Sequence, residues 1–456
     1  MTSEFRALPS VEKILSVPAV GVLAGSYSRH AVAELTRREL ERAREGIRSG
    51  GRAPDLQDIV NSVLERAQNE WRPWPRPVVN ATGVVIHTNL GRAALSESAI
   101  AAVERAARGY SDLEFDIASG GRGSRQTHIS RLLSEVTGAE AGIAFNNNAA
   151  AVLIGLTAVA AGRKVIVSRG EAVEIGGGFR IPDVLRQSGA ELVEVGATNR
   201  TYPRDYEAAI DERAGALLKV HTSNFRVTGF THDVSVAELA DIGKRRGLPV
   251  LNDLGSGCLL DTTQYGLSPE PTVQDSVNFG ADLSFFSGDK LIGGPQAGIV
   301  VGKSEWVSKL ARHPLARAAR MDKMGLAALS ATISSYLKET AEDDIPVWRM
   351  IAMRPEALRE RAESWRAALG IPEARVTGGL SAIGGGSLPG ETLPTALLAI
   401  TPHDNADSLA ARLRSADPPV IARIEDNEVV LDPRTVLADQ DPHVIDAIRS
   451  ALSDSR

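Results

Sequence analysis

The stretch SGDKLIGGPQAG, residues 287–298, places a lysine between the apolar run 283–286 and a turn rich in glycine. A lysine in such a position is partly removed from water, so it loses its proton easily and can attack an aldehyde. The same lysine, Lys290, can instead be an ordinary surface residue at the end of a strand. The residues that precede it in the chain bear on this choice.

An acidic residue and a pair of asparagines also follow apolar runs earlier in the chain. Asp253 ends the run 248–252 and directly precedes a Leu-Gly-Ser-Gly turn. An acid there can cap its own strand, or it can keep a pyridinium nitrogen protonated. Asn147 and Asn148 open an alanine-rich helix, where free N–H groups suit a phosphate, although asparagine is also a common helix cap.

Taken in chain order, this helix start, this acid and the Ser-x-x-Lys motif form the arrangement of fold-type I enzymes that use pyridoxal phosphate (PLP). The sequence therefore predicts that Lys290 binds PLP through a Schiff base, with Asp253 at the ring nitrogen. Asn147, Asn148 and Ser287 are also predicted to bind the cofactor, with Ser287 close to its phosphate. A nucleotide-binding fold is the main rival, but neither G-x-x-x-x-G-K-[ST] nor G-x-G-x-x-G follows the first strand.

Residues 80–325 alternate short β-branched runs with helical patterns. Such alternation predicts an α/β domain with a mostly parallel, seven-stranded-type sheet and helices on both faces. Ligands of these sheets bind at the carboxyl ends of the strands, so residues just after each strand are candidates for the site. The expected strands are 142–147, 163–168, 190–195, 215–223, 248–256, 282–290 and 297–303.

Changes of pattern along the chain predict three domains. Residues 1–70 form a small helical domain, 71–330 the large PLP-binding domain and 331–456 a smaller α+β domain with a hairpin turn at 425–427. From Arg29 to Arg52 there are seven arginines and four glutamates. This local excess of positive charge fits either a solvated helix face or a surface that binds a polyanion.

The composition is that of an ordinary globular protein. The 456 residues carry a formal net charge of −6, which argues against non-specific coating of nucleic acid. Cys258 is the only cysteine, which points weakly to a reducing compartment, and we expect it to be a small buried side chain. The chain has no apolar run of about 18 residues and no signal-peptide pattern, so we expect a cytoplasmic protein without a membrane span. The histidines lack metal-ligand spacing, so we predict no metal site.

Long motifs along the chain are specific to one family. They are NATGVVIHTNLGR (80–92), GRGSRQTH (121–128), FNNNAAAVLI (145–154), SRGEAVEIGGGFRIPDV (168–184), VHTSNFRVTGFT (220–231), NDLGSG (252–257), SGDKLIGGPQAG (287–298) and HPLARAARMDK (313–323). Through these motifs the chain closely resembles the bacterial selenocysteine synthases, the L-seryl-tRNA(Sec) selenium transferases, over nearly its whole length. One departure is Ala197, where the family usually has threonine in a Gly-Thr-Thr-Asn-Arg-Thr loop.

The resemblance implies a reaction and its partners. Serine esterified to the selenocysteine tRNA would undergo PLP-dependent β-elimination to an aminoacrylyl intermediate, to which selenium from selenophosphate then adds. Lys290 would be the base that removes the α-proton. The arginine excess in residues 1–70 favours that domain for tRNA binding, and the family suggests a dimer-based homo-oligomer such as a decameric ring. Competing hypotheses are another fold-type I lyase or aldolase acting on a small amino acid or amino sugar acid, and a non-catalytic tRNA-binding protein.

Three arginines match the motifs of the family's anion site. Arg92, Arg317 and Arg320 would bind the selenium donor, because arginine forks suit oxyanions. Arg317 and Arg320 are spaced i, i+3, which predicts that they share one helix face. Spacing alone fits solvated arginines or interface salt bridges equally well.

Polar residues close to the two strand ends complete the predicted site. Asp289 either tunes proton transfer at the neighbouring lysine or accepts a structural hydrogen bond. Ser223 is predicted to contact the cofactor. His221 and Asn224, which follow the same strand end, are alternatives for contacts to the ring or its 3′ oxygen.

Overall fold

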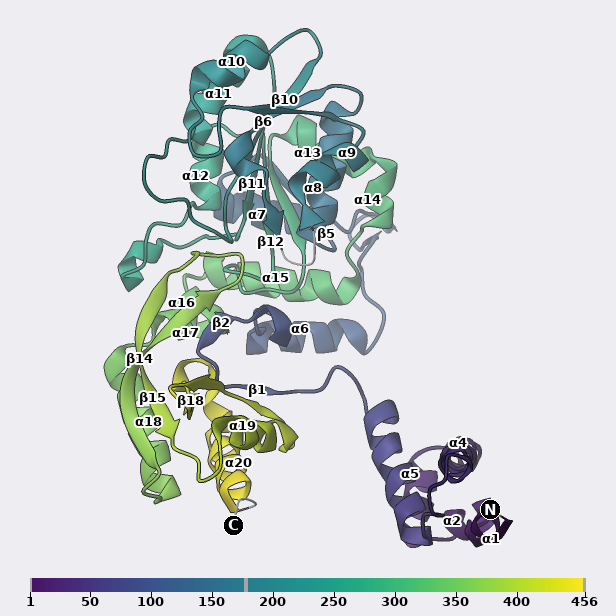
Figure 1. Cartoon of the computed structure of the whole chain (residues 1–456). Helices are drawn as coiled ribbons and strands as arrows, with labels where there is room; N and C mark the ends of the chain where they lie inside the picture. The colour runs from purple at the N-terminus through teal and green to yellow at the C-terminus, as the bar shows by residue number, and fades with distance from the viewer. Residues whose placement is uncertain (1, 176–178, 454–456) are drawn as a thin grey trace. The chain divides into compact units, whose positions relative to one another are not determined.

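The computed structural model describes residues 2–175 and 179–453 and contains two compact units, Met1–Pro77 and Val78–Arg456 (Figure 1). Glycines 176–178 of the motif 168–184 lie outside the described residues. In the described part of the chain no single helix is long and apolar enough to cross a membrane, and one bent pair, Glu4–Leu15 with Pro18–Ser26, passes by length and composition only.

The first unit is built from helices whose apolar sides pack into one core. Its elements are α1 (Thr2–Ala7), α2 (Val11–Leu15), α3 (Pro18–Ser26), α4 (Arg29–Arg48) and α5 (Leu56–Trp71). Helix α4 begins after Ser28 because the serine hydroxyl accepts a hydrogen bond from the N–H of Ala31. Helix α5 begins with a capping box between Asp55 and Asp58.

The second unit contains a seven-stranded sheet in the order β5-β13-β12-β11-β10-β6-β9. Its strands are β5 (Ala141–Phe145), β6 (Lys164–Ser168), β9 (Glu191–Val195), β10 (Ala214–Val220), β11 (Val250–Gly255), β12 (Leu283–Ser287) and β13 (Gly298–Gly302). Strand β13 is antiparallel to β12 and β5, because it returns directly beside β12, and the other pairs are parallel. The predicted mostly parallel seven-stranded sheet is confirmed.

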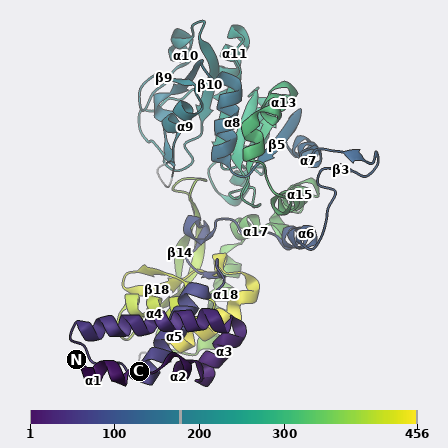
Figure 2. The same ribbon diagram turned by 90° about the vertical axis from the view of Figure 1, so that its right-hand side faces the viewer.

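Helices cover both faces of this sheet (Figures 1 and 2). One face carries α8 (Asn148–Ala160), α9 (Ile181–Gln187) and α13 (Ser304–Arg312). The other carries α7 (Thr127–Thr137), α10 (Pro203–Ala209), α11 (Val236–Arg246), α12 (Val273–Asn278) and α15 (Lys323–Leu337). Phe285 and Phe286 follow one another in β12 and pack into opposite faces. A methyl group at Gly155 in α8 would lie 2.5 Å from the Phe285 ring, so the helix packs closely.

The C-terminal part of the unit has its own five-stranded sheet in the order β17-β18-β15-β14-β2. Its strands are β2 (Val84–Ile86), β14 (Ala374–Gly384), β15 (Thr392–Ile400), β17 (Arg423–Glu425) and β18 (Glu428–Leu431), with α18 (Pro355–Leu369), α19 (Ala406–Ser415) and α20 (Asp441–Ser453) around them. Strand β1 (Val79–Asn80) pairs with β16 (Val420–Ile421). The chain therefore starts this unit in the C-terminal layer before it enters the large sheet.

Short elements connect the two layers and leave one hairpin outside them. Helix α6 (Glu97–Ala107) packs along α15. Figure 2 shows the hairpin of β3 (Phe115–Asp116) and β4 (Gly121–Arg122) projecting beyond α7. The remaining strands and α-helices are β7 (Glu174–Ile175), β8 (Phe179–Arg180), α14 (Pro314–Ala318), α16 (Ala341–Asp344) and α17 (Pro346–Ala352).

Candidate active site

Lys290 lies in the turn after β12 and is buried, with 6 % of its surface exposed. The turn is fixed by its backbone: Leu291 N–H donates to the carbonyl of Ser256, and Gly293 N–H donates to the carbonyl of Lys290. Burial lowers the pKa of Lys290 and the charge of Arg92 lowers it further, while Asp253 opposes both effects. The amine is therefore easier to deprotonate than that of a surface lysine.

Asp253 lies in β11, beside the strand that leads to the lysine, and pairs in register with Phe285. Its carboxylate is buried, and Oδ1 accepts a hydrogen bond of 3.0 Å from Asn148 Nδ2. Burial raises the pKa of Asp253, and the hydrogen bond from Asn148 and the charge of Lys290 partly offset that rise. The acid, the lysine and the start of α8 thus meet at the carboxyl edge of the sheet.

The two asparagines at the start of α8 do different things. Asn147 caps the helix, because its side-chain oxygen accepts from Ala150 N–H at 2.9 Å. Asn148 donates from its side chain to the Asp253 carboxylate in β11. A methyl group at Gly298 in β13 would lie 2.0 Å from the Asn147 carbonyl, so only glycine permits this approach. The first-turn N–H groups other than that of Ala150 suit an anion.

Two serines line the same edge of the sheet. Ser223 is buried, and a methyl group at Gly255 would lie 3.3 Å from its Oγ and 3.7 Å from Lys290 Nζ. Ser223 is therefore close to the lysine amine. Ser287 ends β12 and is also buried. Asn224 instead donates to the carbonyl of Glu174 at 2.7 Å, away from the lysine.

Asp289 forms an ion pair that the sequence does not reveal. Arg92 Nη1 lies 2.7 Å from Asp289 Oδ2, and the N–H of Ala93 donates to the Asp289 carbonyl. Arg92 has a φ of 65°, a left-handed conformation that is unusual for a residue with a side chain. It is held there because its own N–H donates to the carbonyl of His87. Asp289 thus accepts a hydrogen bond from one of the predicted anion-binding arginines.

The prediction that Arg317 and Arg320 share one helix face is wrong. Helix α14 ends at Ala318, because the next residues pair with the end of β5: Asn146 N–H donates to the Ala319 carbonyl, and Arg320 forms a bridge with Phe145. Arg317 is exposed on α14. The Arg320 guanidinium is 3.9 Å from Glu114. Of the three arginines, Arg92 is the one that contacts Asp289, the residue directly before Lys290.

A glycine-rich loop that follows β14, in the C-terminal layer, lies against the side chain of Lys290. A methyl group at Gly386 would lie 2.5 Å from Lys290 Nζ, and Gly386 has a φ of 80°. A side chain here would strain the backbone and would have to displace the lysine amine. The run IGGGSLPG, residues 383–390, was the available signal, but glycine runs of this kind are also common in ordinary turns.

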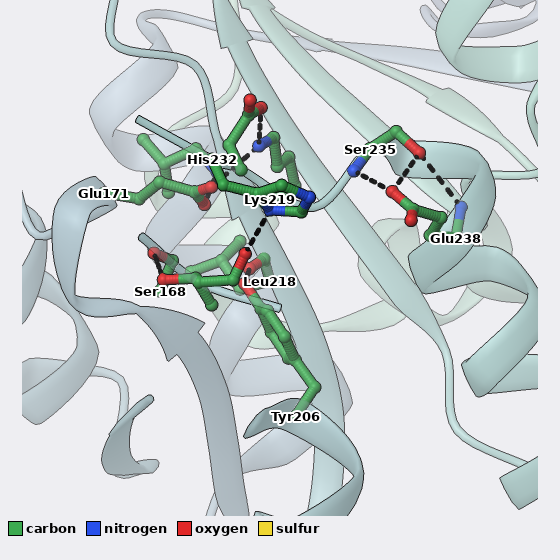
Figure 3. A network of polar contacts seen from close by, with 11 residues as sticks. Ser168, Glu171, Tyr206, Leu218, Lys219, His232, Ser235 and Glu238 are labelled. Carbon is green, nitrogen blue, oxygen red and sulfur yellow. Dashed lines mark hydrogen bonds and ion pairs between the residues drawn. The ribbon is translucent and has the colours of Figure 1, made fainter. Parts of the chain in front are cut away.

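A buried ion pair holds the end of β10, one residue before His221 (Figure 3). Glu171 accepts hydrogen bonds from Lys219 Nζ at 2.8 Å and from the N–H of Val220. Burial alone would lower the pKa of Lys219, but the carboxylates of Glu171 and Asp233 raise it, so the ammonium is retained. The strand end that carries His221 and Ser223 is therefore fixed in place.

The predicted loop of Gly196–Thr201 lies further along the sheet. It follows β9, which two strands separate from β11. Thr201 Oγ1 bonds to Ser168 Oγ at 2.7 Å, and the Thr201 carbonyl bonds to His232 Nδ1. Ala197 contributes its N–H to a tight turn with the Arg200 carbonyl. A backbone contact of this kind does not need a threonine side chain.

Several buried polar atoms near the lysine have no hydrogen-bond partner within the described ranges. They include His87 Nδ1, Asn148 Oδ1, His221 Nε2, Ser256 Oγ, Glu270 Oε1 and Ser387 Oγ. Asn148 and His221 bond Asp253 through other atoms, Ser256 bonds Leu291, and Ser387 follows Gly386. Buried polar groups are normally satisfied, so the unpaired atoms of Asn148, Ser256 and Ser387 mark where the polar atoms of a ligand can bind.

The comparison with known families agrees with this arrangement. Residues 78–437 match the family described as L-seryl-tRNA selenium transferase, and residues 5–44 match the family described as selenocysteine synthase N terminal. The chain belongs to the L-seryl-tRNA selenium transferase family. The membership confirms the resemblance seen in the motifs and disfavours the lyase and aldolase alternatives, because the match spans both units.

Named relatives of the family cover almost the whole chain. The L-seryl-tRNA(Sec) selenium transferase of Moorella thermoacetica is 47 % identical over 455 residues, 98 % of this chain and 97 % of the relative. That of Nitratidesulfovibrio vulgaris is 48 % identical over 471 residues, 99 % of this chain and 100 % of the relative.

Among solved structures, D-glucosaminate-6-phosphate ammonia-lyase has a similar fold. It superimposes with a TM-score of 0.60 at 20 % identity, covering 83 % of this chain and 96 % of that one. This family member therefore has the predicted fold of the fold-type I PLP-dependent enzymes. At such low identity the likeness concerns the fold alone.

Proposed function

We propose that the protein converts L-seryl-tRNA(Sec) into L-selenocysteinyl-tRNA(Sec) with PLP bound at Lys290 and selenophosphate as the selenium donor. The single observation that carries the proposal is the buried Lys290 beside Asp253, at the start of α8, in a chain of this family. When bound, PLP supplies an electron sink for the α-carbon of the amino acid.

The residues present fit that cofactor. Asp253 suits a pyridinium nitrogen, because a buried carboxylate gains from a cationic partner. The free N–H groups at the start of α8, with Asn147 and Ser287 beside them, suit a phosphate. Ser223 suits a polar atom of the ring, because it lies near the lysine amine. The unpartnered polar atoms in this region support the same assignment.

Two residues would carry the proton transfers and charge control at the lysine. Lys290 has a lowered pKa, so its neutral amine is available as the base that takes the α-proton. Asp289 is held by Arg92 and lies next to that base in the chain. Arg92 has further N–H donors on its fork with which to bind a divalent anion. Arg317 and Arg320 are proposed to complete the selenophosphate site.

The helical first unit is proposed to bind the tRNA. Support comes from the arginine excess between Arg29 and Arg52 and from the family match over residues 5–44. Several of these arginines also pair with exposed glutamates on the same helix, as Arg37 does with Glu34 and Arg44 with Glu41. Such exposed pairs are weak, so phosphates can compete for the arginines.

We also propose a dimer-based homo-oligomer, such as a decameric ring, in the cytoplasm. The β3–β4 hairpin exposes Phe115 and Ile117, and Tyr110 before it is fully exposed. The hairpin, α6, α7 and α15 line a groove of about 1140 Å³. Apolar side chains gathered at such a groove favour a protein partner, and a second copy of the chain is the simplest one.

Two measurements test the function. The purified protein should show the absorbance of a lysine-bound PLP, and borohydride should fix the cofactor to Lys290. With seryl-tRNA(Sec) and selenophosphate it should then form selenocysteinyl-tRNA(Sec). Lys290→Ala should lose the absorbance and the turnover together. Full activity of Lys290→Ala, or PLP trapped on another lysine, would show that the assignment is wrong.

A further inference from the structure

A buried carboxylate and an imidazole face each other at the edge of the large sheet. Glu270 Oε1 lies 3.4 Å from His221 Nε2, and the Glu270 side chain is only 3 % exposed. Neither atom is reached by solvent or has a hydrogen-bond partner among the described residues. His221 is the ion-pair partner of this carboxylate when its ring is protonated.

The Glu270 carboxylate is placed to accept a hydrogen bond from His221 Nε2. A carboxylate buried without a cation or a donor is strongly unfavourable. An imidazolium at His221 would give Glu270 both, with Nε2–H directed at the carboxylate and a second proton on Nδ1. The other titratable groups nearby are Cys258, Asp253 and Lys290. Burial raises the pKa of the Cys258 thiol to about 12, so this thiol does not supply the proton near neutral pH.

Backbone hydrogen bonds hold both His221 and Glu270 in place. The N–H of His221 donates to the Asp253 carbonyl at 2.8 Å, which ties the histidine to the strand of the predicted cofactor acid. The N–H of Glu270 donates to Thr262 Oγ1 at 3.0 Å. Glu391 holds the same loop by accepting from the N–H and hydroxyl of Ser268. The ring is thus positioned by the fold rather than by a ligand.

Part of the His221 side chain remains accessible. The side chain is 24 % exposed although Nε2 is inaccessible, so the exposed surface belongs to its other atoms. We propose that His221 is the acid that protonates the seryl hydroxyl as it leaves, and that Glu270 is a positioning residue that fixes its ring. This inference rests on the proposed function and adds a residue to it.

The proposed step balances without a further reactant. Lys290 takes the proton from the α-carbon, and the electron pair left behind forms the Cα=Cβ bond. The Cβ–O bond breaks with its pair on oxygen. His221 enters the step as the imidazolium. Its Nδ1 proton converts the departing hydroxide into water, and the ring is left neutral with its Nε2 proton toward Glu270.

A change of leaving group separates this role from a structural one. Chloride leaves without a proton, so β-chloroalanyl-tRNA(Sec) does not need the acid. His221→Asn should slow water release from seryl-tRNA(Sec) by about 100-fold or more, since a general acid contributes roughly 10²–10⁴-fold. Chloride release should change by about threefold or less if proton donation alone is lost. Glu270→Gln keeps the shape and should show the same pattern more weakly.

The control variant changes a different carboxylate, that of Glu391. Glu391→Gln alters a carboxylate that holds the same loop without facing His221, and it should leave both rates nearly unchanged. PLP binding measured by absorbance, and the thermal midpoint of the apoprotein, should match wild type in all three variants. Imidazole added to His221→Ala should restore water release.

Equal slowing with both leaving groups would overturn the inference. So would loss of PLP binding in step with loss of rate, or absence of rescue by imidazole. If the wild-type protein releases chloride but no water from the seryl substrate, the proposed function itself is wrong and His221 loses this role with it. Water release that persists at the wild-type rate in His221→Asn would contradict the inference alone.

Discussion

The guanidinium of Arg92 lies 2.7 Å from the carboxylate of Asp289, the residue directly before Lys290. The pair joins a loop at the start of the second unit to the turn that follows β12. The positive charge of Arg92 helps to lower the pKa of Lys290, whereas the charge of Asp289 raises it. An arginine proposed to bind the selenium donor therefore already has an anionic partner beside the reactive amine.

This arrangement predicts different losses for two arginines. Arg320→Ala should leave dehydration of seryl-tRNA(Sec) nearly intact and slow selenium capture. Losing one charge-assisted pair costs about 1.5–3 kcal/mol, or roughly 10- to 150-fold, since about 1.4 kcal/mol is tenfold. Arg92→Ala should slow both steps, because it also leaves Asp289 without its cation. Single-turnover measurements of water release and selenium incorporation check this.

Conservative and surface variants complete that test. Arg317→Ala should behave like Arg320→Ala. Lysine at either position should restore capture only in part, because it keeps the charge and loses the fork. Arg108→Ala, which removes an exposed pair with Glu104, should change neither step. Equal loss of both steps in Arg320→Ala would point instead to a structural contact such as its approach to Glu114.

Gly386→Ala should disturb cofactor attachment. Its methyl group would meet Lys290 Nζ at 2.5 Å, and its φ of 80° is costly for alanine by about 1–2 kcal/mol. Gly390→Ala is the matched control, because its φ is 76° and nothing lies within 4 Å of the added methyl. Both variants should lose similar stability in denaturant. Only Gly386→Ala should lose borohydride-trapped PLP, and equal loss in both would rule out a specific contact.

The buried lysine should make the stability of the apoprotein depend on alkaline pH. The pKa of Lys290 in the folded protein lies below the ordinary value of 10.5. At pH values between the two, the unfolded chain therefore binds the Lys290 proton more tightly than the folded protein does. The contribution of Lys290 to the free energy of unfolding should therefore rise with pH across that window. Lys290→Met should be more stable than wild type at neutral pH, by about 1.4 kcal/mol for every tenfold weakening of proton binding in the folded state. Urea unfolding of both proteins at pH 7, 9 and 10 should show this difference shrinking, and a constant difference would contradict it.

Removing the first unit should separate tRNA binding from cofactor binding. Residues 78–456 form a compact unit that contains Lys290 and Asp253, so a chain starting at Val78 should fold and bind PLP. Its affinity for tRNA should fall sharply. In the full chain that affinity should decrease steeply with salt, because phosphate contacts release counterions. Unchanged tRNA affinity after the deletion would show that another surface binds the RNA.

The sequence by itself determined the sheet and the residues expected at its edge. Alternating strands and helices fix a parallel sheet, and parallel strands bring their carboxyl ends to one side. Asp253 and Lys290 each follow an apolar run, so local pattern was sufficient to bring them together. Asn148 was found in the same way, because it begins the helix after β5.

Only the tertiary structure decided which distant residues meet there. Arg92 reaches Asp289, Gly386 closes on Lys290, and Glu270 faces His221 from another loop. Each of these contacts joins segments whose local periodicity contains no information about the partner. The i, i+3 spacing of Arg317 and Arg320 misled for the same reason, since pairing with the end of β5 ended the helix first. Local sequence sets the secondary structure of each segment. Packing between segments that are far apart in the chain sets which groups surround the amine of Lys290.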